Sequence, residues 1–166
     1  YNAEKQRDPN VTALNEEDAY PAMPEDGYGW EKLFSERMCR HFREDYGLQT
    51  RVARFHNVYG PEGTWEGGRE KAPAAVCRKV IAAKLSGNHE IEIWGDGTAI
   101  RDYVYVGDVS RMCSMALKSK RSGIYNCASG HGTSVKHIVD VVEDVTGRSL
   151  DVSYLPDRIF DVKTSI

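Results

Sequence analysis

The sequence lacks the features that would mark a membrane protein, a nucleic-acid-binding protein or a disulfide-stabilised protein. No run of apolar residues is long enough to span a bilayer. A net charge of −3 provides no basic field to attract nucleic acid or a membrane surface. The cysteines form no C-x-x-C pair, so they predict neither a zinc site nor a disulfide framework; they are Cys39, Cys77, Cys113 and Cys127. We therefore expect a cytoplasmic protein with buried free thiols, no metal, and no nucleic-acid or membrane partner.

Helical and strand-like patterns alternate along the 166 residues, which indicates an α/β fold. The first 27 residues carry Pro9, Pro21 and Pro24 among acidic clusters and are predicted to form loops. Helices are expected at 28–46, 72–85, 107–120 and 133–147, and strands at 50–60, 90–94, 101–106, 123–129 and 150–155. This content is enough for one domain or for part of a larger one.

The helix expected at 28–46 has two faces of different character. Its apolar residues recur every four positions and form what we call the apolar stripe: Trp30, Phe34, Met38 and Phe42. Tyr28 and Lys32 lie one turn apart on the opposite face. A lysine ammonium can stabilise a tyrosinate, and such a tyrosine can act as an acid or base. The same spacing also occurs as an ordinary surface pair, and the stripe suits either core packing or an interface between two copies.

Blocks of sequence around and after this helix favour a catalytic interpretation of Tyr28 and Lys32. "YGWEK" at 28–32 is followed by "RFHNVYGP" at 54–61, "IWGDGTAIRDYVYVGDV" at 93–109, "GIYNCASGHGTSV" at 123–135 and "PDRIFDV" at 156–162. In this order the blocks resemble the extended short-chain dehydrogenase/reductase family, the NAD-dependent sugar-nucleotide epimerases and dehydratases. The resemblance implies a Rossmann-like α/β fold, NAD as cofactor and a nucleotide sugar as substrate.

One further block narrows the implied substrate. "GTWEGGREKAPAAVCRK" at 63–79 is similar to the branch of this family that epimerises GDP-mannose at C3 and C5. The resemblance implies conversion of GDP-mannose to GDP-L-galactose through transient oxidation at C4 by bound NAD. A UDP-hexose 4-epimerase and a nucleotide-sugar 4,6-dehydratase remain alternatives, because the blocks at 93–109 and 123–135 are shared across the family.

The resemblance also implies roles for particular residues. Tyr28 and Lys32 would act at the sugar C4 hydroxyl beside the cofactor, with Phe55 in the same cofactor site. Lys71 would be the acid of a Cys/Lys pair at the sugar ring. The implied substrate-binding residues are Asn57, Gly68, Arg69, Lys71, Lys79, Arg101 and Arg158. Arginine and lysine suit such a role because they bind diphosphate oxygens; for Lys79 the alternative is a solvated position on a helix surface.

The sequence shows no G-x-x-G-x-x-G dinucleotide-binding loop. "GYGWEK", "GDGTAI" and "GHGTSV" each lack the third glycine. The resemblance therefore implies the C-terminal part of an extended short-chain dehydrogenase fold, without the N-terminal half that carries this loop and the partner cysteine. Residues 1–60 would be the remnant of the NAD-binding domain. Residues 61–166 would be mainly the substrate-binding region, with 123–147 packing back on the NAD-binding domain.

Two further expectations concern assembly and activity. The resemblance implies a homodimer that forms through the apolar stripe. Without the glycine loop, NAD affinity should be poor, and this chain alone could be inactive. A function of another class therefore stays open: a non-catalytic fragment that serves as a binding or assembly module. The NAD content of the purified chain and its incubation with GDP-mannose distinguish the two.

Overall fold

The chain folds as an α/β protein, which confirms the fold class expected from the sequence. The computed structural model describes residues 2–147, 149–157 and 163–166. Its helices are α1 (Ala3–Arg7), the 3₁₀ helix η1 (Glu16–Ala19), α2 (Gly27–Tyr46), α3 (Ala72–Ser86), α4 (Val106–Lys118) and α5 (Val135–Thr146). Its strands are β1 (Arg51–Phe55), β2 (Asn57–Tyr59), β3 (Glu90–Trp94), β4 (Ile100–Tyr105), β5 (Gly123–Cys127), β6 (Gly132–Ser134), β7 (Asp151–Leu155) and β8 (Thr164–Ser165).

The strands form three small sheets. β1 pairs with β5, β3 pairs with β7, and β4 lies between β2 and β6 and also pairs with β8. In the part of the chain that the structure describes, every pairing between these strands is parallel except that of β4 with β6. Parallel strands need crossover connections, and helices between the strands supply them. This topology is the reason that helical and strand patterns alternate in the sequence.

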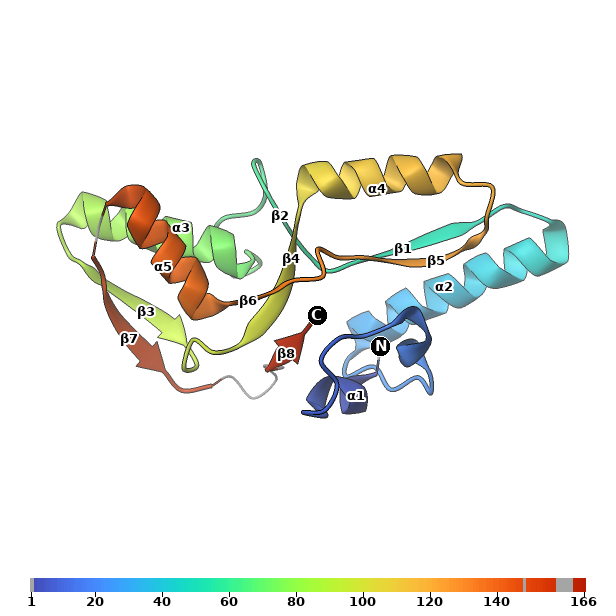
Figure 1. Ribbon diagram of the computed structural model, residues 1–166, viewed down its shortest axis with the longest axis horizontal. Coiled ribbons are helices and arrows are strands. Elements are labelled where there is room, and N and C mark those ends of the chain that lie inside the picture. Colours follow the sequence, from blue (N-terminus) through green and yellow to red (C-terminus); the bar gives the residue numbers. More distant parts are fainter. Residues whose placement is uncertain (1, 148, 158–162) are drawn as a thin grey trace.

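The elements separate into two halves with different packing (Figure 1). One half, which we call the packed lobe, consists of α3, β3, α5 and β7. The other, which we call the open half, consists of α2, β1, α4 and β5, with α2 and α4 on either side of the two strands. β2 and β4 lie between the halves, and the N-terminal segment lies beside the start of α2.

Aliphatic side chains from three elements close the core of the packed lobe. They are Val76, Val80 and Ala83 of α3, Ile91 and Ile93 of β3, and Ile138 and Val139 of α5. The spacing of four and three places the α3 residues on one helix face. Alternation along β3 turns its two isoleucines toward the helices and leaves Glu90 and Glu92 exposed.

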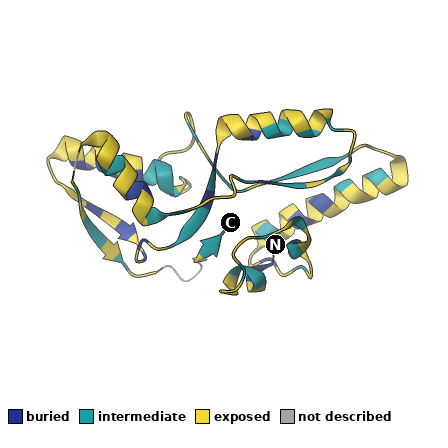
Figure 2. Cartoon of the chain, viewed as in Figure 1, coloured by how far each residue is buried: buried dark blue, intermediate teal, exposed yellow. Residues whose placement is uncertain are grey.

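The open half leaves much of its apolar surface uncovered (Figure 2). Within α2 the buried residues are Leu33 and Glu36, which lie on the face opposite the apolar stripe. In the stripe itself Phe34 is 65% exposed, and Trp30, Met38 and Phe42 are also exposed. Core packing within the chain was one of the two explanations for the stripe. In this structure it is wrong, because α2 turns its other face toward the strands.

The expected helices are confirmed to within about two residues at their ends. α2 begins after Asp26, whose carboxylate accepts the backbone N–H of Gly29 at 2.8 Å, and it ends at Gly47 with a φ of 69°. α5 begins after Ser134, whose hydroxyl accepts the N–H of His137 at 3.1 Å. The strand expected at 50–60 divides at His56, because its two parts, β1 and β2, pair with strands of different sheets.

The expectation of a continuous loop over the first 27 residues is wrong. α1 and η1 interrupt it, and each is fixed by a polar side chain rather than by an apolar face. Asn2 accepts the N–H of Lys5 at 3.1 Å, and Asp18 accepts the N–H of Asn15 at 2.8 Å. Helices this short show no hydrophobic period, so the pattern of the sequence does not reveal them.

The expected burial of the cysteines is also wrong in part. Cys127 is buried, but Cys77 is exposed and Cys39 and Cys113 are half-buried, and all four are free thiols. Burial raises the pKa of the Cys127 thiol. Over the described ranges, no helix is both long enough and apolar enough to cross a membrane, and no cluster of side chains could hold a metal ion.

Candidate active site

A cavity of about 830 Å³ lies where α2, the junction of β1 with β2, and the N-terminal segment meet. Five of the predicted site residues line it: Tyr28, Lys32, Phe55, Asn57 and Lys71. They come from three separate blocks of the sequence. Ligands of α/β proteins bind at the carboxyl ends of parallel strands, which is where β1 meets this cavity.

Tyr28 and Lys32 project from the first two turns of α2 into the cavity. Tyr28 is 68% exposed, and the Lys32 Nζ lies 5.1 Å from the centre of the Tyr28 ring. The same ammonium is 3.3 Å from Oε1 of Glu31. An ammonium group at this range can stabilise negative charge that develops on the phenol oxygen. The pair therefore brings a hydroxyl and an ammonium group together in the cavity, and its acid/base role stays a prediction.

The passage from β1 into β2 adds an apolar ring and an amide to the cavity. The backbone N–H of His56 donates to the carbonyl of Cys127 at 3.1 Å, which fixes the junction to β5. The Asn57 side chain donates to the carbonyl of Asp102 at 3.3 Å, which fixes it to β4. Phe55, which directly precedes these anchors, is 49% exposed. An open aromatic ring thus stands beside a polar group that is held in place.

Lys71 is the residue that precedes the first turn of α3, at the end of the glycine-rich loop over 60–70. Gly67 and Gly68 adopt φ values of 88° and 81°, a region that favours glycine. The Arg78 side chain ties this loop to α3, since it donates to the carbonyl of Trp65 at 3.0 Å and to Glu70 at 3.1 Å. These Arg78 hydrogen bonds fix the C-terminal end of the loop, where Lys71 lies.

Glu70 stands out next to Lys71, although the sequence patterns did not single it out. Hydrogen bonds from its own backbone and from Arg78 hold the pKa of its carboxyl below the ordinary value, against the opposing effect of burial. Its Oε2 is buried and has no hydrogen-bond partner among the described residues. A buried carboxylate oxygen without a partner is unusual in a folded protein.

The other predicted substrate-binding residues do not line the described part of the cavity. Gly68 and Arg69 lie exposed on the glycine-rich loop. The Lys79 ammonium donates to the carbonyl of Glu92, and the Arg101 guanidinium donates to the carbonyl of Ile100 at 2.8 Å. Arg158 lies outside the described residues. Their roles stay predictions.

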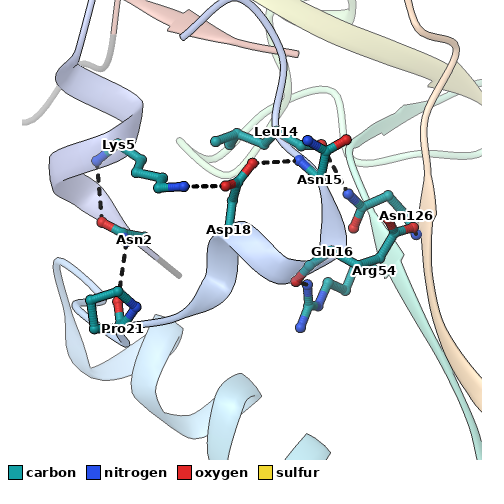
Figure 3. Close-up of polar contacts among 9 residues, drawn as sticks. All are labelled: Asn2, Lys5, Leu14, Asn15, Glu16, Asp18, Pro21, Arg54 and Asn126. Atoms are coloured by element: carbon teal, nitrogen blue, oxygen red, sulfur yellow. Dashed lines mark hydrogen bonds and ion pairs between the residues drawn. The ribbon is translucent and has the colours of Figure 1, made fainter.

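The N-terminal segment supplies cavity residues that the sequence patterns missed. Asn2, Gln6, Asn15 and Asp18 all line the cavity. Figure 3 shows the Asp18 carboxylate between Lys5 and the backbone N–H of Asn15. These hydrogen bonds, chiefly that from Lys5, lower the pKa of Asp18. An Asn followed three residues later by an Asp is a helix-start pattern, and it could have indicated structure at this point.

Arg54, also in the cavity lining, connects three elements. Its Nε and Nη2 donate to the two carboxylate oxygens of Glu36 at 2.9 and 2.7 Å. Its Nη1 donates to the carbonyl of Glu16 at 2.8 Å, a contact visible in Figure 3. The Glu16 carboxylate in turn accepts the backbone N–H of Asn126 on β5 at 2.7 Å. The floor of the cavity is thus held by charged hydrogen bonds rather than by apolar packing.

Comparison with known proteins places these features in a family. Residues 3–128 match the NAD dependent epimerase/dehydratase family. The chain is 40% identical over 152 residues to GDP-mannose 3,5-epimerase 1 of Oryza sativa subsp. indica, a match that covers 92% of this chain and 39% of that protein. It is 31% identical to UDP-glucose 4-epimerase of Halalkalibacterium halodurans, which covers 85% of this chain and 46% of that protein.

A solved structure supports the same assignment. Thermus thermophilus UDP-glucose 4-epimerase in complex with NAD superimposes with a TM-score of 0.79 at 29% identity, covering 95% of this chain and 50% of that chain. The chain thus spans half or less of the length of these relatives. The Rossmann-like fold and the family inferred from the sequence blocks are confirmed. This chain belongs to the NAD dependent epimerase/dehydratase family.

Proposed function

We propose that the protein epimerises a nucleotide sugar, with GDP-mannose as substrate and GDP-L-galactose as product. The observation that carries the proposal is the cavity, where the acid/base pair of Tyr28 and Lys32 shares one space with Lys71. The 40% identity to a GDP-mannose 3,5-epimerase supports the choice of substrate.

The groups at the cavity suit the nicotinamide end of NAD. Phe55 presents an open ring, and Tyr28 and Lys32 present a hydroxyl and an ammonium at the carboxyl end of a parallel strand. These three residues would hold the cofactor. When bound, NAD supplies the reversible removal of hydride from C4 of the sugar.

Tyr28 is the acid/base at the sugar 4-hydroxyl. Its phenol takes the hydroxyl proton and later returns it, while the Lys32 ammonium stabilises the negative charge on the phenol oxygen in between. A ketone at C4 makes the hydrogens at C3 and C5 acidic. The cysteine partner implied by the resemblance would remove the hydrogen from one face of each carbon, and Lys71 delivers a proton to the opposite face. Asn57, in the same cavity, orients the substrate.

The diphosphate group of the nucleotide sugar would bind the remaining cationic residues. We propose that Arg69, Lys79, Arg101 and Arg158 bind its oxygens, with Gly68 allowing close approach of the loop backbone. Residues 61–166 then serve mainly the nucleotide sugar, residues 1–60 serve NAD, and 123–147 belong with the NAD-binding part. β5 pairs with β1, in keeping with that division, whereas α5 packs on α3.

A UDP-hexose 4-epimerase is the second candidate, because 31% identity relates the chain to UDP-glucose 4-epimerase. The two reactions differ in solvent exchange. Epimerisation at C3 and C5 passes protons through side chains, so it introduces deuterium from D₂O at those carbons, whereas epimerisation at C4 returns the same hydride. Incubation of the protein and NAD with GDP-mannose or UDP-glucose in D₂O, followed by NMR of the sugars, distinguishes them.

The proposal predicts GDP-L-galactose or GDP-gulose with deuterium at C3 or C5. Turnover of UDP-glucose alone, without deuterium, selects the second candidate. Loss of water to give a 4-keto-6-deoxy sugar would identify a dehydratase. Absence of any turnover, together with absence of bound NAD, would overturn the proposal and favour a non-catalytic binding or assembly module.

We also propose that the apolar stripe of α2 forms a homodimer in the cytoplasm. Its exposed Trp30, Phe34, Met38 and Phe42 would be covered by the same residues of a second copy. Sedimentation of Phe34→Glu tests the interface, with Arg40→Glu on the same helix as a control outside the stripe. A Phe34→Glu variant that stays dimeric would exclude this interface.

A further inference from the structure

Lys32 has a possible ion-pair partner on its own helix besides Tyr28, the residue beside which it lies. Lys32 and Glu36 are four residues apart on α2, a spacing at which opposite charges on a helix attract each other. Yet among the described residues no ion pair joins them. The Lys32 ammonium instead lies 5.1 Å from the centre of the Tyr28 ring and 3.3 Å from the exposed Glu31 carboxylate.

The Glu36 carboxylate is already occupied. Arg54 binds both of its oxygens, at 2.9 and 2.7 Å, in the parallel fork that arginine forms with carboxylates. The two side chains are only 12% and 6% exposed, so water competes little for them. Arg54 is itself fixed from its other side by the carbonyl of Glu16 (Figure 3), and it therefore cannot follow Glu36 toward Lys32 without losing that bond.

Asp18, a carboxylate that does line the cavity, is also paired. It shares the cavity with Lys32, and its partners are Lys5 and the backbone N–H of Asn15. Both the carboxylate on the inner face of α2 and the one across the cavity thus have hydrogen-bond donors of their own. The Lys32 ammonium is left beside Tyr28.

We propose that Arg54 is a positioning residue for the Tyr28–Lys32 pair: by occupying Glu36, it keeps that carboxylate from drawing the Lys32 ammonium down the helix and away from Tyr28. The chemical importance of this arrangement rests on the proposed function, in which Tyr28 exchanges a proton with the substrate. The arrangement itself does not, and it can be measured without turnover.

The measurement is the chemical shift of the Lys32 side chain. An aromatic ring shifts nearby protons upfield, so the ε-methylene signal of Lys32 should be displaced from those of solvated lysines. Lysine labelled with ¹³C at Cε reports this by NMR, with Lys32→Arg to assign the signal and Tyr28→Leu to show that the ring causes the displacement. The protein carries neither NAD nor substrate in this experiment.

Arg54→Met leaves Glu36 without its partner, and the Lys32 ammonium should move toward it. The upfield displacement is then lost. Glu36→Leu breaks the same ion pair and disturbs the same packing, but it removes the competing carboxylate, so the displacement is kept. The double variant Arg54→Met/Glu36→Leu also keeps it. A role of Arg54 in structure alone would give the same change in both single variants, and that result would overturn the proposal.

Two further variants complete the design. Arg40→Met breaks the exposed Arg40–Glu44 pair on the same helix and should leave the Lys32 signal unchanged; a change there would contradict the specificity claimed for Arg54. If Arg54→Met does not fold, as judged by circular dichroism, Arg54→Lys replaces it. A lysine cannot bind both oxygens of Glu36 in a fork, so it should reduce the displacement; an unchanged signal in Arg54→Lys overturns the proposal.

Discussion

The packed lobe and the open half are each built from two helices and a pair of parallel strands, but different forces hold them. Aliphatic side chains of α3, β3 and α5 close the packed lobe. In the open half α2 buries one leucine and one glutamate, and its apolar stripe faces outward. The candidate site lies beside the half with the weaker apolar core. The geometry of that site therefore depends on a few charged hydrogen bonds.

The largest expected effect is a cavity in the packed lobe. Ile93 is 5% exposed, so Ile93→Ala should cost about 3 kcal/mol of unfolding free energy through lost burial and an unfilled space. Ile81→Ala on the solvent side of α3 should cost about 0.5 kcal/mol or less. Urea unfolding at low protein concentration measures both.

Phe34→Ala tests the open half in the same urea series. Because the apolar stripe is exposed, the variant should lose about 0.5 kcal/mol of unfolding free energy or less. A loss of unfolding free energy that grows with protein concentration would indicate the proposed dimer. A concentration-independent loss as large as that of Ile93→Ala would contradict the difference between the halves.

The next effect is expected at the Arg54–Glu36 ion pair, the charged anchor of the open half. Glu36→Leu leaves the largely buried Arg54 side chain without its carboxylate and should cost about 2 kcal/mol of unfolding free energy. The double variant Glu36→Leu/Arg54→Met should recover most of this, because it removes the uncompensated charge. Glu44→Leu, which breaks an exposed pair on the same helix, should cost about 0.5 kcal/mol or less. Equal losses for Glu36→Leu and Glu44→Leu would show that the anchor is not needed.

A smaller effect should follow loss of a helix cap in each half. Ser134→Ala removes the hydroxyl that accepts from His137, and Asp26→Ala removes the carboxylate that accepts from Gly29. Each should cost about 1 kcal/mol. By hydrogen exchange, Ser134→Ala should lower amide protection throughout the packed lobe, whereas Asp26→Ala should lower it only near the start of α2. Uniform effects in both variants would argue against two differently held halves.

The smallest expected effect depends on pH. Because the pKa of Glu70 is lowered in the folded chain, its ionised form stabilises the glycine-rich loop above the unfolded pKa of about 4.3. That contribution is lost as the pH falls through the lower folded value. Amide protection factors over 63–69, corrected for intrinsic exchange, should fall a few-fold across this window. Glu70→Gln should remove the pH dependence, and a variant that keeps it would implicate another group.

The local elements were predictable because their signals are local. The apolar period of α2 and α3 and the glycine after α2 mark them in the sequence. The break at His56 was not predictable, because "ARFHNVY" contains neither glycine nor proline and the division comes from pairing with two different sheets. Short helices such as α1 and η1 depend on single polar side chains, which periodicity does not detect.

The candidate site was predictable only through the resemblance of sequence blocks. Spacing alone left Tyr28 and Lys32 as a surface pair, and no pattern joined them to Lys71. The Arg54–Glu36 pair could not be predicted from either. It joins residues 18 apart in the chain, and it exists only because α2 lies with its inner face toward β1.

The most direct test of the central claim is the turnover of GDP-mannose by Tyr28→Phe in the presence of NAD. Tyr46→Phe is the matched control, because Tyr46 is an exposed tyrosine at the other end of the same helix. Loss of the phenol proton donor at the site should reduce kcat by about 100-fold or more, with Tyr46→Phe unchanged. Equal turnover by the two variants would contradict the account.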